Sequence, residues 1–209
     1  MTNVFHTALV SRLDVALANN CSASNEKKMR KLASMLANDK LASMLTEANV
    51  DADRLSRAIY ACEKVVKFAS QAVALNAKDL NENTYAIFRT AINCYRHDVA
   101  LTKVMIEASI SRDVKVDDAV KHIVYSRSII QTAETIAAQS QTSTDALLTL
   151  NIIEVNAAAK NAYSVNLTAL AEALANTFKI DTAKVEIEET EEANEEVAAE
   201  EIANEEVDA

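Results

Sequence analysis

Apolar residues recur every three or four positions along most of the chain, which is the spacing of one face of a helix. Phe5, Leu9 and Leu13 begin this pattern, with Thr2 or Asn3 available as the N-cap. The spacing predicts a helix over residues 3–18. A polar, Asn-rich stretch over residues 19–25 then predicts a loop, because Asn tolerates the left-handed conformation better than most residues.

A second helix is expected to start near Glu26, and it contains the first copy of a repeated hexapeptide. Lys-Leu-Ala-Ser-Met-Leu occupies residues 31–36 and again residues 40–45. The two copies start nine residues apart, which is about two and a half helical turns, so an unbroken helix would present them on opposite faces. We therefore expect a break at Asn38-Asp39 that lets both copies face one core.

The same periodicity predicts further helices separated by polar connections. One helix is expected over 55–75, and a second begins at Thr84 as N-cap and reaches Leu101. Another covers 120–137, and a polar break over 139–144 ends in a capping-box pattern formed by Thr142 and Asp145. Asn recurs at 151, 156, 161 and 166, a period that a β-solenoid could explain, but the apolar spacing over 167–178 and the Ala-rich stretch at 157–160 favour helix.

The pattern as a whole predicts an all-α fold. We expect a multi-helix bundle of about six or seven helices over residues 1–180, followed by a disordered acidic C-terminal tail over residues 181–209.

Composition narrows the possible functions, because the 209 residues include no Gly and no Pro. This absence excludes the P-loop, the Rossmann turn, the nucleophile elbow of hydrolases and the EF-hand loop, all of which require Gly. The longest apolar runs are far below the roughly 18 residues of a membrane span, and the N-terminus lacks the features of a secretory signal. A cytoplasmic or virion-associated location is expected.

The net charge of −10 is concentrated at the C-terminal end. Residues 181–209 contain thirteen acidic residues and one base, Lys184, so this tail carries −12 and the preceding residues carry +2. The tail repeats Glu-Glu followed by Val197, Ile202 and Val207 every five residues, which forms no stripe on a helix. Such a tail either makes the protein more soluble or acts as an acidic arm that competes for a basic surface or recruits a partner.

The sequence offers few residues for catalysis or metal binding. Cys94 and His97 form a Cys-x-x-His pair that His122 could join, but no further Cys or His pair supplies a fourth zinc ligand. No nucleophile stands in a recognisable motif with a base. We therefore expect no enzyme, no metal and no cofactor.

Cations between Glu26 and Arg127 are the candidates for binding nucleic acid, since they neutralise phosphates. The predicted nucleic-acid-binding residues are Lys27, Lys28, Arg30, Lys31, Arg54, Arg57, Lys64, Lys67, Arg89 and Arg96. The aromatic residues interleaved with them could stack on unpaired bases, but their helical spacing is more typical of core packing; these residues are Tyr60, Phe68, Tyr85, Phe88 and Tyr95.

A mildly basic helical body with an acidic tail is similar in layout to accessory proteins of viral and bacterial DNA metabolism. That resemblance is one of composition, covers no motif and implies no residue roles. The first hypothesis is a non-enzymatic accessory protein that binds nucleic acid through its N-terminal two-thirds, with the tail as electrostatic competitor or partner-recruiting arm. The alternative is a structural, scaffold-like assembly protein that self-associates through Ala-rich helices, so the expected partner is nucleic acid, another protein or a second copy, and no membrane.

Overall fold

The computed structural model describes residues 3–55, 59–73 and 80–185, and this part of the chain is mostly helical. Its elements follow in the order α1 (Val4–Ala18), α2 (Ala23–Leu36), α3 (Asp39–Glu47), α4 (Ala52–Leu55), α5 (Ile59–Ala69), the 3-10 helix η1 (Ser70–Val73), α6 (Glu82–Arg96), β1 (Leu101–Thr102), α7 (Lys103–Ile110), α8 (Ala133–Thr149), β2 (Ile153–Val155), β3 (Ala162–Val165) and α9 (Ala169–Phe178). In the ranges described, every helix is too short or too polar to cross a membrane.

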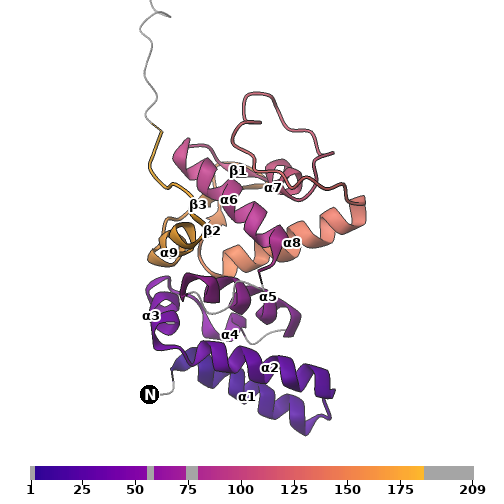
Figure 1. Ribbon diagram of the computed structural model, residues 1–209, viewed down its shortest axis with the longest axis vertical. Helices are drawn as coiled ribbons and strands as arrows, with labels where there is room; N and C mark the ends of the chain where they lie inside the picture. Colours follow the sequence, from indigo (N-terminus) through magenta and orange to yellow (C-terminus); the bar gives the residue numbers. More distant parts are fainter. Residues whose placement is uncertain (1–2, 56–58, 74–79, 186–209) are drawn as a thin grey trace, which may run out of the picture.

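The helices are stacked in successive layers along the long axis of the molecule (Figure 1). α1 and α2 pair at one end, α5 lies on α2, and α8 packs on the far side of α5 and contacts α6. α9 contacts α3 and η1, so the C-terminal helix returns to the middle of the stack. One buried apolar cluster runs through these layers and includes Leu32, Val66, Ile87, Leu147 and Leu174.

The N-terminal helices form as predicted, except that α2 begins at Ala23 rather than near Glu26 and so shortens the predicted loop 19–25. Asn3 caps α1, since its Oδ1 accepts a hydrogen bond from the His6 amide at 2.9 Å. The repeated hexapeptide is broken at Asn38, whose Oδ1 accepts from the Leu41 amide at 3.0 Å and starts α3. Both copies then turn their leucines into the core.

The boundaries predicted for α6 are wrong at both ends. Asn81, rather than Thr84, is the N-cap, and its Oδ1 accepts from the Thr84 amide at 3.0 Å. The helix ends at Arg96, and Leu101 lies in β1 instead of on the helix. Thr84 is fully buried in the first turn, because its hydroxyl finds partners on Asn81 and Ser143.

The helix predicted over 120–137 is also wrong. Residues 111–132 form a long connection without helix or strand, and α8 begins only at Ala133. The polar stretch 139–144 lies inside α8, so Thr142 and Asp145 start no new helix. Ser143 is buried there and hydrogen-bonds side chains of α5 and α6, which is why polar residues do not end this helix.

A small antiparallel sheet of order β1-β3-β2 replaces part of the predicted last helix, so the fold is mostly helical but not all-α. Tyr163 of β3 pairs with Leu101 on one side and Val155 on the other. The recurring Asn residues at 151, 156, 161 and 166 flank β2 and β3 instead of marking a helix or a solenoid. The apolar spacing over 167–178 does form a helix, α9.

Five helices end in the same way without Gly. After each of them one residue adopts positive φ, and the next amide donates back to the carbonyl of the helix five residues earlier, as in a Schellman motif. These left-handed residues are Asn20, Asn49, Asp98, Asn151 and Lys179. The following residues, Cys21, Val50, Val99, Ile152 and Ile180, make the closing hydrogen bonds at 2.9–3.0 Å.

Candidate nucleic-acid interface

The first group of predicted cations lies on the outer face of α2. The helix buries Met29, Leu32 and its other apolar residues, and this leaves Lys27, Lys28 and Lys31 exposed. Arg30 is exposed as well, but its guanidinium is 2.8 Å from the carboxylate of Glu26 one turn earlier. The sequence analysis therefore placed these four residues correctly on one helix, with Lys27 and Lys31 one turn apart.

Glu63 of α5 lies between two of the predicted cations. Its carboxylate is 2.7 Å from the Lys67 ammonium and 3.4 Å from that of Lys28. Burial alone raises the pKa of Glu63, but the hydrogen bonds and charges of Lys67 and Lys28 outweigh it and hold the pKa below its ordinary value. Two lysines thus share one carboxylate, and the α2–α5 surface keeps a positive excess.

Lys64 lies apart from this surface, in the interior. Its side chain is 5% exposed, and its ammonium donates to Gln139 Oε1, Thr142 Oγ1 and Ser143 Oγ of α8 at 3.3, 2.7 and 3.1 Å. Burial lowers the pKa of Lys64 to about 8, although the charge of Asp145 opposes the shift. The buried position takes Lys64 out of any contact surface and gives it a role between α5 and α8.

The remaining cations of the N-terminal part add little. Arg54 of α4 is half-exposed, and its guanidinium is 3.9 Å from the carboxylate of Asp51. Arg57 lies outside the described residues.

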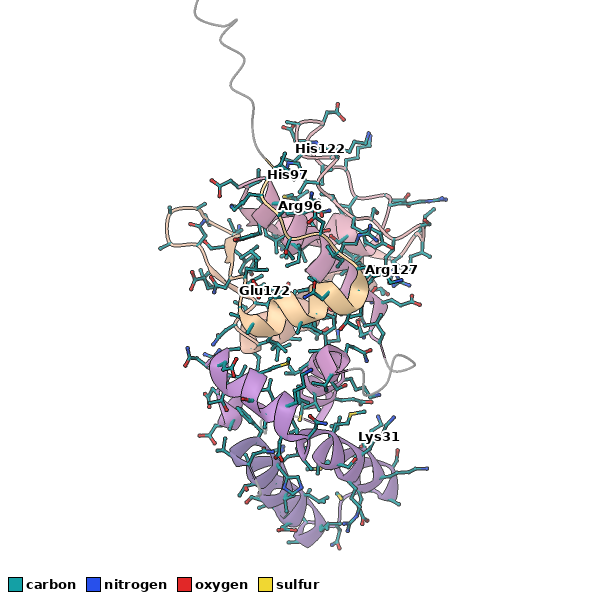
Figure 2. All side chains as sticks on the ribbon, turned by 60° about the vertical axis from the view of Figure 1, so that its left-hand side comes forward. Lys31, Arg96, His97, His122, Arg127 and Glu172 are labelled. Atoms are coloured by element: carbon teal, nitrogen blue, oxygen red, sulfur yellow. The ribbon has the colours of Figure 1, made fainter. Side chains whose placement is uncertain are left out.

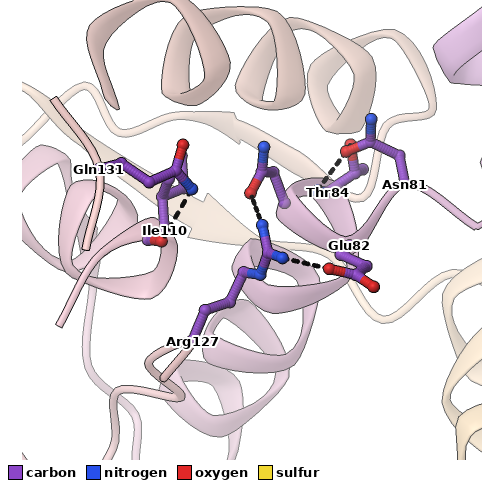
Figure 3. Close-up of polar contacts among 7 residues, drawn as sticks. Asn81, Glu82, Thr84, Ile110, Arg127 and Gln131 are labelled. Carbon is purple, nitrogen blue, oxygen red and sulfur yellow. Dashed lines mark hydrogen bonds and ion pairs between the residues drawn. The ribbon is translucent and has the colours of Figure 1, made fainter. Parts of the chain in front are cut away.

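Arg89 belongs to a cluster of polar and aromatic side chains on α6. Its guanidinium lies 4.3 Å from the centre of the Tyr125 ring and donates to the Tyr85 hydroxyl at 3.4 Å. The two tyrosine rings meet edge to face at 5.8 Å. Arg127 lies beside them and binds Glu82 and Asn83 at the start of α6, as the close-up in Figure 3 shows.

A cavity of about 390 Å³ opens next to this cluster. Tyr85, Tyr125 and Arg127 line it together with Glu82 and apolar residues. The Arg127 guanidinium offers a contact for a phosphate, and the half-exposed rings of Tyr85 and Tyr125 offer a stacking surface for an unpaired base. The sequence analysis missed Tyr125 and Arg127, because it assigned their segment to a helix.

The segment 111–132 lies along α6 through specific hydrogen bonds. The Asn93 side chain donates to the Ile123 carbonyl at 2.8 Å, and the Tyr125 amide donates to Thr90 Oγ1 at 3.0 Å. Arg127 adds its contacts near the start of the helix. These bonds satisfy the backbone without helix formation, and they position Tyr125 and Arg127 at the cavity.

Arg96, at the end of α6, is covered by the start of the predicted tail. Its guanidinium is 2.7 Å from Asp181 Oδ2 and donates to the Ala183 carbonyl at 3.0 Å, and the Val185 amide donates to the Arg96 carbonyl at 2.9 Å. Lys184 in turn lies 2.8 Å from Asp98 and 4.3 Å from the centre of the Tyr95 ring. Residues 181–185 thus bind the body, whereas residues 186–209 lie outside the described part.

Some of the interleaved aromatic residues pack in the core, and others lie at the surface, where they could stack on bases. Phe68 and Phe88 are buried and pack edge to face at 5.4 Å, so they belong to the core. Tyr85 and Tyr95 are half-buried, one at the cavity and one under Lys184. The side chain of Tyr60 lies outside the described residues.

The Cys-x-x-His pair forms no metal centre with its neighbours. The rings of His97 and His122 do meet, at 5.2 Å between centres, as Figure 2 shows near Arg96. Cys94 is fully buried, and burial raises the pKa of its thiol to about 12. Across the ranges described, no three His, Cys, Asp or Glu side chains gather as metal ligands do.

The chain matches no protein-family model, and neither a curated protein nor a solved structure was found to match it.

Proposed function

We propose that the chain is a non-enzymatic accessory protein that binds nucleic acid through its basic surfaces and that its acidic C-terminal tail competes for them. The contact of residues 181–185 with Arg96 is the observation that carries this proposal. A predicted nucleic-acid-binding arginine already holds a carboxylate from the base of the tail, as a competitor would require. Residues 186–209 continue from that point with a net charge of −12.

Two surfaces would provide the nucleic-acid contacts. The exposed lysines of α2, Lys27, Lys28 and Lys31, would neutralise phosphates. The cavity beside Tyr85, Tyr125 and Arg127 would accept an unpaired base, which favours single-stranded over duplex nucleic acid. A tail tethered to the same chain acts at an effective concentration in the millimolar range, so weak contacts suffice for competition.

The test compares binding of labelled single-stranded and duplex oligonucleotides across a salt series. The full chain is compared with forms that end at Val185 or at Ile180, and a full-length form with Gln for each Glu from 186 to 206 is the control for length. We expect both truncations and the Gln form to bind more tightly than the full chain, and added salt to weaken all binding. The form that ends at Ile180 also lacks Asp181 and Ala183, so it exposes Arg96 as well. The proposal fails if no form binds in a salt-sensitive way.

A second function, self-assembly, is favoured by a different observation. Ile129 and Ile130 are 39% and 60% exposed, and they precede the first turns of α8, where Ala133, Ala137 and Ala138 are also exposed. Figure 1 shows this end of α8 projecting from the body. Such an apolar patch would suit a second copy of the chain. Sedimentation equilibrium of the full chain tests it: association that Ile130→Asn weakens at least several-fold supports assembly, and a monomer at high concentration contradicts it.

A further inference from the structure

A second cavity, of about 440 Å³, lies between α7 and the 111–132 segment. Its apolar part is formed by Ala108 of α7 together with Val114, Val116 and Val124. A branched aliphatic side chain fits within this volume and would contact these four residues. We call it the loop cavity.

Three cations line the loop cavity as well. Arg112, Lys115 and Lys121 line it together with a single carboxylate, Asp118. Asp118 is 3.7 Å from Lys121, and both side chains are largely exposed. Arg112 and Lys115 form no ion pair with any residue in the described ranges, so the lining keeps an excess of positive charge.

The described chain ends close to this cavity. The Val185 amide is hydrogen-bonded to the Arg96 carbonyl, and His97, which follows Arg96, contacts the ring of His122. His122 in turn follows Lys121, which lines the cavity. Figure 2 shows Arg96, His97 and His122 together at one end of the molecule. The 24 residues that follow Val185 can span up to about 80 Å when extended, which is ample for reaching the cavity.

The sequence of the tail complements the loop cavity. Each of its last three repeats places two glutamates before one aliphatic residue, Val197, Ile202 or Val207. These residues form no continuous apolar stripe, but a single cavity requires only one of them at a time. We propose that one Glu-Glu-Val or Glu-Glu-Ile unit inserts its aliphatic side chain into the loop cavity and places its carboxylates on Arg112, Lys115 and Lys121.

This inference rests on the proposed function and deepens it: Val124 and Ser126, which line the loop cavity, flank Tyr125 in the sequence, so a tail docked there holds its carboxylates beside the surface for which it competes. The docking itself needs no nucleic acid. Three equivalent repeats raise the local concentration of the docking unit and allow one repeat to replace another.

The experiment is carbodiimide cross-linking of the full chain, with the linked residues identified by mass spectrometry. The reagent joins a carboxylate to an amine only when they are in contact. The ion pairs Lys67–Glu63 and Lys184–Asp98 are internal positive controls, at 2.7 and 2.8 Å. We expect Lys115 and Lys121 to link to Glu195–Glu206 at least several-fold more than Lys27 and Lys31 do, and high salt to remove these links.

A full-length variant with Val197→Ser, Ile202→Ser and Val207→Ser separates insertion from charge attraction alone. It keeps every carboxylate and changes no residue of the described core. We expect its links to Lys115 and Lys121 to fall several-fold. Links that stay unchanged in this variant, or that concentrate on Lys27 and Lys31, overturn the inference.

Two further outcomes are distinguished by the same samples. Mixing isotope-labelled and unlabelled chains shows whether the links join one chain or two, and links between chains overturn the proposed docking within one chain. Links at the loop cavity without any oligonucleotide binding leave the inference standing while the proposed function fails. Oligonucleotide binding that becomes stronger when the tail is removed, together with links only on α2, supports the proposed function and overturns the inference.

Discussion

Lys64 is a lysine whose position in the sequence gives a misleading picture of its environment. It lies in a basic stretch of α5, yet its ammonium is buried against three neutral acceptors of α8. The sequence could show that its neighbours Cys62, Val65 and Val66 are apolar. It could not show that Ser143, 79 residues later, would hydrogen-bond it, because that contact depends on how two helices pack.

The stability of the protein should therefore depend on pH through Lys64. The native pKa of about 8 is below the ordinary value of 10.5, so the unfolded chain binds more protons between these two values. The free energy of unfolding should rise with pH over this range, by about 3 kcal/mol relative to Lys64→Met. Urea unfolding of both proteins from pH 7.5 to 10.5 measures it. A difference between them that does not change with pH contradicts the prediction.

Helix ends show how elements are joined in a chain without Gly. The Asn-rich stretch 19–25 predicted the first break, and Asn20 makes it by adopting the left-handed conformation. Asp98 does the same at a point where the apolar spacing predicted that the helix continues to Leu101. The strands were missed because β2 and β3 are only three and four residues long, and the second partner of β3 is β1, about 60 residues earlier. The Asn period marks the ends of these strands, but the Ala-rich stretch at 157–160 favours helix and does not show a hairpin.

Asn151 joins two of these helix ends, and its substitution should be more harmful than that of a matched residue. Its side chain donates to the carbonyls of Ala48 and Asn49 at 2.7 and 2.9 Å, which links the end of α8 to the end of α3. We expect Asn151→Gly to lower the free energy of unfolding by about 1–2 kcal/mol, because two hydrogen bonds are lost.

Asn20→Gly is the matched control for Asn151→Gly. Asn20 has the same left-handed backbone and is exposed, so its change should be close to neutral, because the ease with which Gly adopts positive φ offsets its larger loss of entropy on folding. Thermal and urea unfolding of the two variants compare these effects. Equal losses of stability in both would show that the conformation, and not the link to α3, decides the result.

At the scale of the whole molecule, the chain divides into two parts of opposite net charge. Residues 1–185 carry +2, and residues 186–209 carry −12. The sequence predicted the acidic tail and the α2 cations from composition and helical spacing alone. It could not place Tyr125, Arg127 or the loop cavity, because they depend on a segment whose backbone is satisfied by side chains of α6.

The α2 lysines should contribute to nucleic-acid binding in a measurable and nonspecific way. In the form that ends at Val185, Lys27→Gln with Lys31→Gln should weaken binding of every duplex tested alike. The slope of log K against log salt should fall in magnitude by about 2, since each phosphate contact contributes roughly 0.9. Lys160→Gln, which removes an exposed cation from the β2–β3 connection, is the control and should leave the slope unchanged. An unchanged slope in the double variant excludes α2 from the interface.

Hydrolysis after Lys184 would reverse the sign of the net charge of the chain. Lys184 is its last basic residue, so a protease of trypsin-like specificity has no site beyond the Lys184–Val185 bond. Cleavage there would release all of the tail's net charge as one peptide and change the remaining protein from −10 to +2. The contacts of Lys184 with Asp98 and Tyr95 restrain its half-exposed side chain, so loss of those contacts should speed cleavage of this bond.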